Sequence, residues 1–526
     1  MTYLRKGYSR KETSQSQAIP GSSQVENSAG GFSWKVDDWK RLDRFLILGS
    51  EGGTYYIHQE KLTRENAEAV ERCIKEDGAR VVTRVVEISE SGRASKNDPA
   101  LFTLAMCASL GDNPTRKAAL ENLSRVARIG THLFHFASYV EDFRGWGRGL
   151  RTAIGNWYNS KSPEDLGFQV TKYQQRDKWS NRDLLRLSHP KAPSPEHQQI
   201  YSWITKGKGE TSSKIIEGFE RAQATTNETE LAYLIKEYGL TIEMVPTQFL
   251  TSSLIWSFLL PNLGYTALIR NLGNMSKSGL LVRGNFPTNE AITTRLTDPD
   301  AIKKSKVHPI GILTALLTYS QGHGIRGKGE WEVVPDIVDA LDQAFYISFG
   351  NVTPTNKRLV LALDVSGSMS WGEIAGIEKL TPRLASAALA MVTYKIEKKV
   401  VLLGFQDKLV ELDISRHSTL KGVEEAISNL SFGRTDCAQP MLWASESKTA
   451  IDTFSIYTDS ETWFGKIHPS QALDKYRRET NIPSKLAVVG MVSNGFSIAD
   501  PDDSGMLDVV GFDTATPEII SQFIEG

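Results

Sequence analysis

The chain has 526 residues, too many for one hydrophobic core, so we expect at least two domains. Its three cysteines, Cys73, Cys107 and Cys437, exclude a disulfide framework or a zinc cluster, and no stretch approaches the roughly 18 apolar residues that a membrane span needs. The charge balances overall, at 61 basic against 62 acidic residues. It is uneven along the chain, because residues 351–526 hold 17 basic and 23 acidic residues, about −6, which leaves about +5 on the first 350. We therefore expect a soluble, cytoplasmic protein whose two parts meet different partners.

Residues 1–31 are predicted to form a flexible amino-terminal tail. This segment is rich in Ser, Gln and Gly and lacks the apolar centre of a secretory signal.

Residues 32–352 are predicted to be a helical domain. Apolar residues recur there at helical spacing in short pieces divided by Gly, Pro or polar breaks, among them DDWKRLDRFLIL, RENAEAVERCIKE and IGILTALLTY. Many short helices with short links favour an α-solenoid, in which each helix pair buries its apolar face on the next. An irregular helical bundle is the alternative, because we find no strict sequence repeat.

The stretch from Gln169 to Lys191 is the most basic part of this domain. It holds six basic residues against two acidic ones. Ser180 and Asp183 have the spacing of a capping box, which predicts that a helix begins at Asn181. The basic side chains of this stretch, and His189 with them, are candidate phosphate contacts: Lys172, Arg176, Lys178, Arg182, Arg186 and His189.

Spacing along the chain groups these side chains into two edges. Arg182 and Arg186 share one face of the predicted helix with His189, and we expect Lys172 and Arg176 to form an i, i+4 pair on a helix before it. Tyr173 and Trp179 lie between the two edges and could stack on bases. The alternative is an ordinary solvated face, since a charged stripe usually is one and Asp177 and Asp183 weaken the field.

A second basic candidate is the loop GHGIRGK, residues 322–328. It matches the glycine spacing of a dinucleotide fingerprint but follows a predicted helix, whereas that fingerprint needs a strand before it. We interpret it as a basic turn whose Arg326 and Lys328 are available to phosphate, with a plain solvated loop as the alternative. His132 and His135, one helical turn apart, are expected to be packed or capping histidines.

Residues 353–526 are predicted to be a doubly wound α/β domain. The runs RLVLALD, KVVLLGF, FSIYTD and KLAVVGM are apolar on both faces and alternate with helical stretches, as buried parallel strands do. Ligands of such sheets bind beyond the carboxyl ends of the strands. Hydroxyl and carboxylate side chains are found at those ends: Asp364, Ser366, Ser368, Thr435 and Asp459.

These five side chains offer oxygen ligands only. Such a set suits Mg²⁺ or Mn²⁺, which prefer octahedral oxygen shells. A helix cap after a strand would also explain the pentapeptide Asp364 to Ser368, but not the Thr loop and the second strand-end Asp that follow in order. That order resembles the metal-ion-dependent adhesion site of von Willebrand factor A domains. The resemblance implies that all five residues are metal ligands, and that an acidic group of a protein partner binds through the metal.

Longer segments extend the resemblance to both domains. DRFLILGSEGGTYYI, VTKYQQRDKWSNRDLLRLSHPK, YTALIRNLGNM and SNGFSIADPDDSGMLDVVGFD resemble, in the same order, the Ro RNA-binding autoantigen family, from about residue 32 to the end. The resemblance implies a ring of HEAT-like helical repeats, the TROVE domain, joined to a von Willebrand factor A domain.

The family resemblance also implies a function. It implies binding of small noncoding Y RNAs on the outer basic face, with contacts in the segment from Lys172 to His189, and of single-stranded 3′ ends of misfolded structured RNAs in the central hole. Bacterial members are similar to adaptors that assist exoribonucleases such as polynucleotide phosphorylase in RNA maturation and decay, notably under stress. In one departure, Arg434 stands where animal members are expected to have glycine, beside Thr435, and could weaken metal binding.

Two other classes of function remain open. One is a metal-dependent protein-binding scaffold without direct RNA contact. The other is a metal-dependent hydrolase, but it needs a general base near the metal, and the loops offer neither a His nor a second carboxylate cluster. We therefore expect a protein that is not an enzyme.

Overall fold

The computed structural model describes residues 11–48, 67–94, 96–207, 211–324, 329–350, 353–370, 380–428, 430, 433–490, 495–511 and 515–525. The chain divides into two compact units. The helical unit comprises residues 71–92 and 96–348, and the α/β unit comprises residues 1–70, 93–95 and 349–526. The α/β unit is therefore assembled from both ends of the sequence.

Helices make up nearly all of the helical unit. They are α2 (Glu68–Ser91), which begins in the other unit, α3 (Asp98–Leu110), α4 (Asn113–Glu121), α5 (Leu123–Val126), α6 (Gly130–Phe143), α7 (Arg148–Asn159), α8 (Pro163–Lys172), α9 (Asn181–Ser188), α10 (Pro195–Lys206), α11 (Lys214–Ala224), α12 (Glu228–Tyr238), α13 (Ser253–Leu259), α14 (Tyr265–Lys277), α15 (Phe286–Leu296), α16 (Pro299–Ser305), α17 (Pro309–Ser320) and α18 (Pro335–Ile347). A short hairpin, β3 (Gln175–Arg176) and β4 (Trp179–Ser180), interrupts them between α8 and α9.

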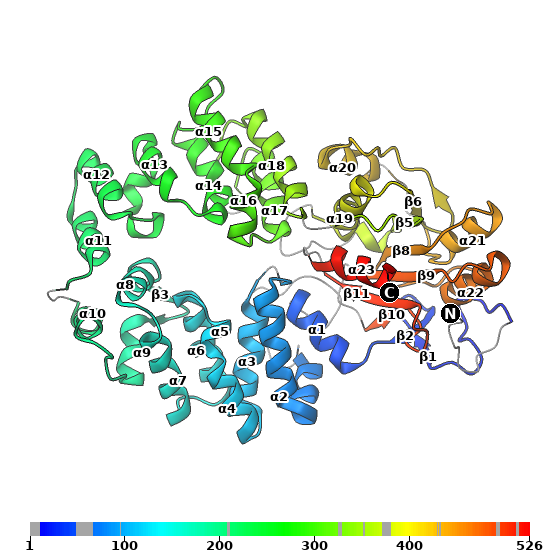
Figure 1. The fold of residues 1–526 in the computed structure, drawn as a ribbon, viewed down its shortest axis with the longest axis horizontal. Coiled ribbons are helices and arrows are strands. Elements are labelled where there is room, and N and C mark those ends of the chain that lie inside the picture. Colours follow the sequence, from blue (N-terminus) through cyan, green and yellow to red (C-terminus); the bar gives the residue numbers. More distant parts are fainter. Residues whose placement is uncertain are drawn as a thin grey trace. The chain divides into compact units, whose positions relative to one another are not determined.

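These helices pack mainly on their neighbours in the sequence. Helix α3 packs on α4 and α6, α11 on α12, and α17 on α18. Figure 1 shows the helices from α3 to α18 following one another along an arc. Local pairing along a curved path is the arrangement of an α-solenoid, so this prediction is confirmed over the irregular bundle.

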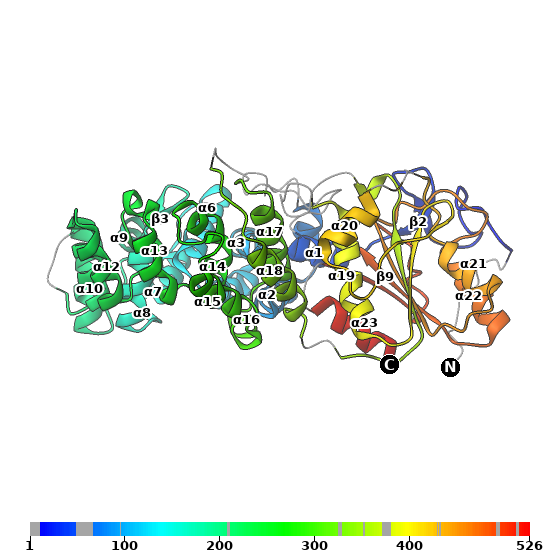
Figure 2. The ribbon, with the colours of Figure 1, turned by 90° about the horizontal axis from the view of Figure 1, so that it is seen from above.

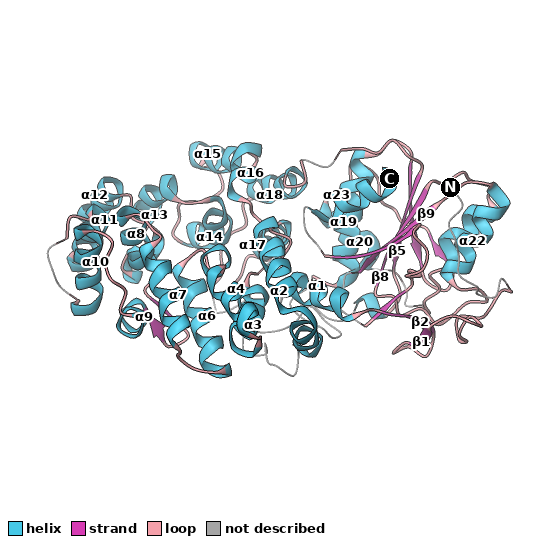
Figure 3. Ribbon diagram, turned by 60° about the horizontal axis from the view of Figure 1, so that its bottom comes forward, coloured by secondary structure: helices cyan, strands magenta, loops and turns pink. Residues whose placement is uncertain are grey.

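The α/β unit holds most of the strands, as Figure 3 shows. Its elements are β1 (Gln24–Glu26), β2 (Phe32–Lys35), α1 (Asp38–Leu48), β5 (Leu359–Asp364), η6 (Ser368–Ser370), α19 (Pro382–Ile396), β6 (Val400–Phe405), β7 (Leu409–Val410), α20 (Leu420–Ser428), α21 (Gln439–Glu446), β8 (Thr453–Thr458), α22 (Pro469–Thr480), β9 (Lys485–Gly490), β10 (Phe496–Ser497), β11 (Met506–Val510) and α23 (Ala515–Glu525).

The main sheet has the strand order β11-β9-β8-β5-β6-β7. All neighbours pair in parallel except β7, which pairs with β6 antiparallel at the edge. Every residue of β5 and β8 is buried, because helices cover both faces: Figure 2 shows α19, α20 and α23 on one side and α21 and α22 on the other. The four apolar runs correspond to β5, β6, β8 and β9, so the doubly wound prediction is confirmed.

The prediction of a flexible tail is wrong for residues 11–31. Strand β1 lies in this segment and pairs with β2, which also pairs with β10 near the carboxyl end, and Gln15 is fully buried. The segment has no apolar periodicity because polar side chains, hydrogen-bonded to residues more than 400 positions away, hold it in place. Residues 1–10 lie outside the described part of the chain.

Candidate functional sites

The predicted metal residues converge where the two central strands end. Asp364 is the last residue of β5 and is fully buried, and Asp459 directly follows the neighbouring strand β8 with 6% of its surface exposed. Parallel strands end at the same edge of a sheet, so the two carboxylates lie close together there.

Hydroxyl groups link the two carboxylates. One oxygen of Asp364 accepts from the backbone N–H of Ser366 at 2.9 Å, and the other accepts from the hydroxyl of Thr458 at 2.7 Å. The hydroxyl oxygens of Ser366 and Ser368 are 3.2 Å apart, and Ser368 hydrogen-bonds to Asp459. The structure therefore brings Asp364, Ser366, Ser368 and Asp459 into one cluster.

Thr435 reaches this cluster through its loop. Its side chain is buried, and its carbonyl oxygen accepts from the backbone N–H groups of Trp463 at 3.3 Å and Phe464 at 3.1 Å, just past Asp459. The thiol of Cys437 lies 3.6 Å from the same Thr458 hydroxyl that donates to Asp364. The loop of Thr435 is thus joined to the end of β8, and through Thr458 to Asp364 of β5.

The electrostatics of this cluster suit a cation. Burial raises the pKa of Asp364, and the nearby carboxylate of Asp459 raises it further; burial also raises the pKa of Asp459. Two carboxylates that resist ionisation side by side are stabilised in the charged form by a positive charge between them.

One such charge already lies behind the first loop. Arg383 of α19 is 5% exposed and donates to the carbonyl oxygens of Val365 at 2.5 Å and Ser366 at 2.9 Å. The guanidinium also lies close enough to Asp364 for the two charges to attract each other. The two carboxylates and the hydroxyls around them offer oxygen atoms, which are the ligands that Mg²⁺ and Mn²⁺ prefer.

Arg434, the departure noted in the sequence, is engaged with aromatic rings. Its guanidinium carbon lies 4.8 Å from the ring centre of Phe464 and 5.7 Å from that of Trp463. The side chain is therefore part of a cation–π group beside Thr435.

The second candidate site is a basic surface formed by the β3–β4 hairpin and α9. Arg176, Lys178, Arg182, Arg186 and His189 are exposed there. The capping box is present, because the Ser180 hydroxyl accepts from the backbone N–H of Asp183 and the Asp183 carboxylate accepts from that of Ser180. Helix α9 begins at Asn181 as predicted.

The residues before α9 differ from the prediction. Helix α8 ends at Lys172, and Arg176 lies in β3, so the expected i, i+4 pair on a helix is wrong. The hairpin turns at Asp177 and Lys178, which both have positive φ, and Asp177 contacts the buried His135 of α6. Held by a residue 42 positions earlier, the turn directs Arg176 and Lys178 outward.

The aromatic prediction holds only in part. Trp179 is 8% exposed and packs on Trp146 with ring centres 5.2 Å apart, so it is not available to stack on a base, whereas Tyr173 is half-buried.

The packing of Trp146 on Trp179 reveals basic residues that the sequence interpretation missed. Arg148 and Arg151 of α7, which follows Trp146 and packs on α9, are exposed, and the signal was the basic string RGWGRGLR.

Arg326 and Lys328 lie outside the described residues.

Comparison with known proteins relates both units to one family. The TROVE domain family matches residues 25–318, and the Ro60 vWA domain family matches residues 358–524. RNA-binding protein RO60 of Deinococcus radiodurans is 41% identical over 508 residues, which cover 96% of each chain. The chain belongs to the RO60 family. RNA-binding protein RO60 of Caenorhabditis elegans is 35% identical over 585 residues, 96% of this chain and 90% of that one.

A solved RO60-family structure shares the fold. The crystal structure of Deinococcus radiodurans RO (RSR) protein aligns with a TM-score of 0.73 at 40% identity, over 93% of this chain and all of that one. The family and the two-part fold predicted from the sequence are thereby confirmed.

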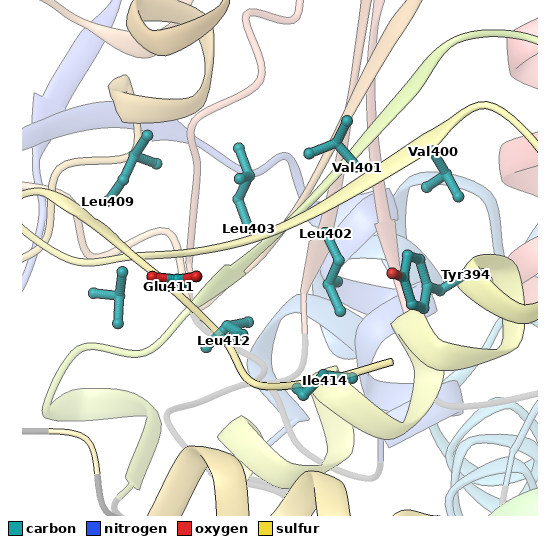
Figure 4. Close-up of a pocket in the computed structure, with 10 residues that line it drawn as sticks. Tyr394, Val400, Val401, Leu402, Leu403, Leu409, Glu411, Leu412 and Ile414 are labelled. Atoms are coloured by element: carbon teal, nitrogen blue, oxygen red, sulfur yellow. The ribbon is translucent and has the colours of Figure 1, made fainter. Parts of the chain in front are cut away.

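A pocket of about 500 Å³ lies apart from the residues of both candidate sites in this RO60-family chain. It is bounded by β6, β7 and the residues that follow β7, and its lining is aliphatic except for Tyr394 and Glu411 (Figure 4). Among the described residues, no helix combines the length and apolar character needed to cross a membrane.

Proposed function

We propose that this protein binds small noncoding RNAs of the Y RNA class on the basic surface of α9 and the β3–β4 hairpin. We further propose that it holds single-stranded 3′ ends of misfolded structured RNAs, acting in the cytoplasm in RNA quality control, maturation or decay. The observation that carries the proposal is that surface itself, in a chain whose relatives are named RNA-binding proteins.

Electrostatics account for the affinity of such a surface. Each phosphate that Lys or Arg neutralises releases counterions, giving a salt slope of roughly −0.7 to −0.9 per contact. Asp183 takes part in the capping box, and Asp177 contacts His135. Both acidic side chains of the stretch are therefore engaged in contacts within the protein. Three of the predicted contacts have partners within the protein. Lys172 lies 4.0 Å from Glu243 and over the ring of Phe168, Arg176 lies 3.9 Å from Asp177, and Arg186 donates to the carbonyl oxygen of Thr205 at 3.2 Å.

The α/β unit would bind a protein partner, such as an exoribonuclease of the polynucleotide phosphorylase kind. Asp364, Ser366, Ser368, Thr435 and Asp459 would hold Mg²⁺ or Mn²⁺, and the bound ion supplies a coordination position for an acidic group of that partner. These ligands include no general base, so the protein acts as an adaptor and not as an enzyme. The adaptor would bring a bound RNA end to the nuclease.

The test of the RNA proposal is the double variant Arg182→Glu with Arg186→Glu. Its affinity for a small folded RNA, with and without a single-stranded 3′ tail, is compared with that of the unchanged protein across a salt series. The matched control is Lys398→Glu with Lys399→Glu, which makes the same charge change at exposed positions of the α/β unit.

We expect the α9 variant to lose at least tenfold in affinity and to show a salt slope smaller by about 1 to 2, with the control unchanged. Equal losses in both variants would show that only net charge matters. Tail-dependent binding supports the role in handling 3′ ends. Weak, tail-independent binding by the unchanged protein would favour the metal-dependent protein scaffold instead.

A further inference from the structure

The amino-terminal segment, residues 11–31, packs on the two loops of the candidate metal site. The first loop carries Thr435, and the second, residues 459–467, begins with Asp459. The segment and both loops belong to the α/β unit. Two side chains of the segment, Gln15 and Asn27, hydrogen-bond to these loops.

Gln15 joins the two loops with its side-chain amide. Its Nε2 donates to Oδ1 of Asp436 at 2.6 Å, next to Thr435, and to the carbonyl oxygen of Ile467 at 2.8 Å in the second loop. Its Oε1 accepts from the hydroxyl of Thr462, and its backbone N–H donates to the carbonyl oxygen of Gly465 at 3.1 Å. Since Gln15 is fully buried, water does not compete for these bonds.

Thr462 connects Gln15 to the first loop through a further hydrogen bond. Its hydroxyl oxygen accepts from the backbone N–H of Cys437 at 3.2 Å while its proton points to Gln15. The Thr462 hydroxyl also lies 3.4 Å from the carbonyl oxygen of Thr435, but its closer acceptor is Oε1 of Gln15. Gln15, Thr462 and the first loop are thus joined by a chain of hydrogen bonds.

A second contact holds the backbone of the Asp459 loop. Asn27 donates from Nδ2 to the carbonyl oxygen of Thr462 at 2.8 Å, and Gly31 lies so close that a Cβ on it would be 2.0 Å from that oxygen and 2.6 Å from the Cα of Trp463. Only glycine fits this approach. The amino-terminal segment therefore contacts the second loop at Thr462, Trp463, Gly465 and Ile467.

We propose that Gln15 is a positioning residue of the metal site, which sets the separation of the loops carrying Thr435 and Asp459 and so raises the affinity for the divalent cation. This inference rests on the metal site proposed above. Cations such as Mg²⁺ tolerate little departure from their preferred geometry, so an ordered pair of loops binds more tightly than a loose pair.

The test measures binding of Mn²⁺ alone to the full chain by calorimetry and electron paramagnetic resonance. Gln15→Ala removes all side-chain bonds, and Gln15→Met keeps about the size of the side chain but has neither the donor to Asp436 and Ile467 nor the acceptor for Thr462. The matched control is Gln471→Ala. Gln471 lies in α22, outside the two metal loops, and ties the same segment to that helix, accepting from the N–H of Thr13 at 3.1 Å and donating to the carbonyl oxygen of Lys11 at 2.9 Å.

We expect about tenfold weaker Mn²⁺ binding for both Gln15 variants and a change within twofold for Gln471→Ala. Melting curves without metal identify the folded temperature range, and affinities are compared only within it. Equal Mn²⁺ affinity in all proteins, or an equal loss in the Gln471 control, would overturn the role of Gln15 and leave the metal site standing. Failure of the unchanged protein to bind Mn²⁺ would overturn the metal site and this inference with it.

Discussion

Arg383 shows at the scale of one residue how the candidate metal site is built. Its guanidinium lies behind the Asp364 loop and donates to the carbonyl oxygens of Val365, Ser366 and Ile427, the last at 3.2 Å. The same charge lies close enough to Asp364 to favour its ionised form. The guanidinium thus places a buried positive charge near Asp364.

Replacing Arg383 by Met is expected to destabilise the α/β unit by about 3 kcal/mol in metal-free buffer, since it leaves three buried carbonyl oxygens without this donor and removes a positive charge near Asp364. Mg²⁺ should restore part of the loss by supplying charge at the same place. Urea unfolding followed by tryptophan fluorescence, with EDTA or with Mg²⁺, measures both effects. A loss that is identical in the two buffers would argue against electrostatic coupling between Arg383 and the site.

His132 should make the stability of the helical unit depend on pH. Burial, the charge of Arg128 and the neighbouring His135 lower the pKa of His132 to about 4 from an ordinary value near 6.5. Between about pH 4 and pH 6.5, His132 is therefore protonated in the unfolded chain but neutral in the folded chain. This contribution to stability is complete above pH 6.5 and is lost as the pH falls toward 4.

We expect the helical unit to lose up to about 2 kcal/mol between pH 7 and pH 5 through this group. His132→Asn, which cannot take up a proton, should flatten that part of the pH dependence whatever its effect at pH 7. Melting temperatures of both proteins at several pH values provide the measurement. Parallel curves for the two proteins would assign the pH dependence to other groups.

At the scale of elements, the hairpin and α9 show what the sequence could and could not predict. The helix start and its capping box were predictable, because Ser180 and Asp183 interact across three residues. The hairpin was not, because Asp177 and Lys178 adopt positive φ without the glycine that usually marks such a turn. The interaction that secures it comes from His135, on another helix.

Ser180→Ala is expected to destabilise α9 by about 1 kcal/mol, because the backbone N–H of Asp183 loses its acceptor. A matched control is Ser188→Ala at the other end of α9, where the hydroxyl donates to the carbonyl oxygen of Leu184 and caps nothing. Amide hydrogen exchange along α9 compares the two. Equal protection in both variants would contradict a role for the cap.

At the scale of the whole molecule, two units with different chemistry share one chain. The helical unit carries the basic surface and the α/β unit the oxygen cluster, so ligands should stabilise them separately. We expect Mg²⁺ at about 100 times its Kd to stabilise the α/β unit by about 2.7 kcal/mol, raising its melting transition by roughly 5 to 10 °C. Calorimetry of the unchanged protein and of Asp364→Asn tests this, with the shift expected only in the former.

The division into units was only partly readable from the sequence. Apolar periodicity identified the helices and the parallel strands because those signals lie within short windows. It gave no sign that residues 11–48 belong with the carboxyl-terminal part, because β2 pairs with β10 and Arg44 pairs with Asp508, more than 450 residues further on. Such pairing leaves no local pattern.

The same long-range pairing has a consequence for synthesis of the protein on the ribosome. Asp436, the hydrogen-bond partner of Gln15, lies 421 residues further along the chain. At a synthesis rate of 5 to 20 residues per second, the ribosome reaches it about 20 to 80 s after Gln15. Throughout that time the helical unit can fold, and β1 and β2 can pair with each other, but β2 lacks its second partner, β10. The newborn chain therefore exposes an unpaired edge of β2 until β10, Phe496–Ser497, emerges, and this interval is when a chaperone would be most needed.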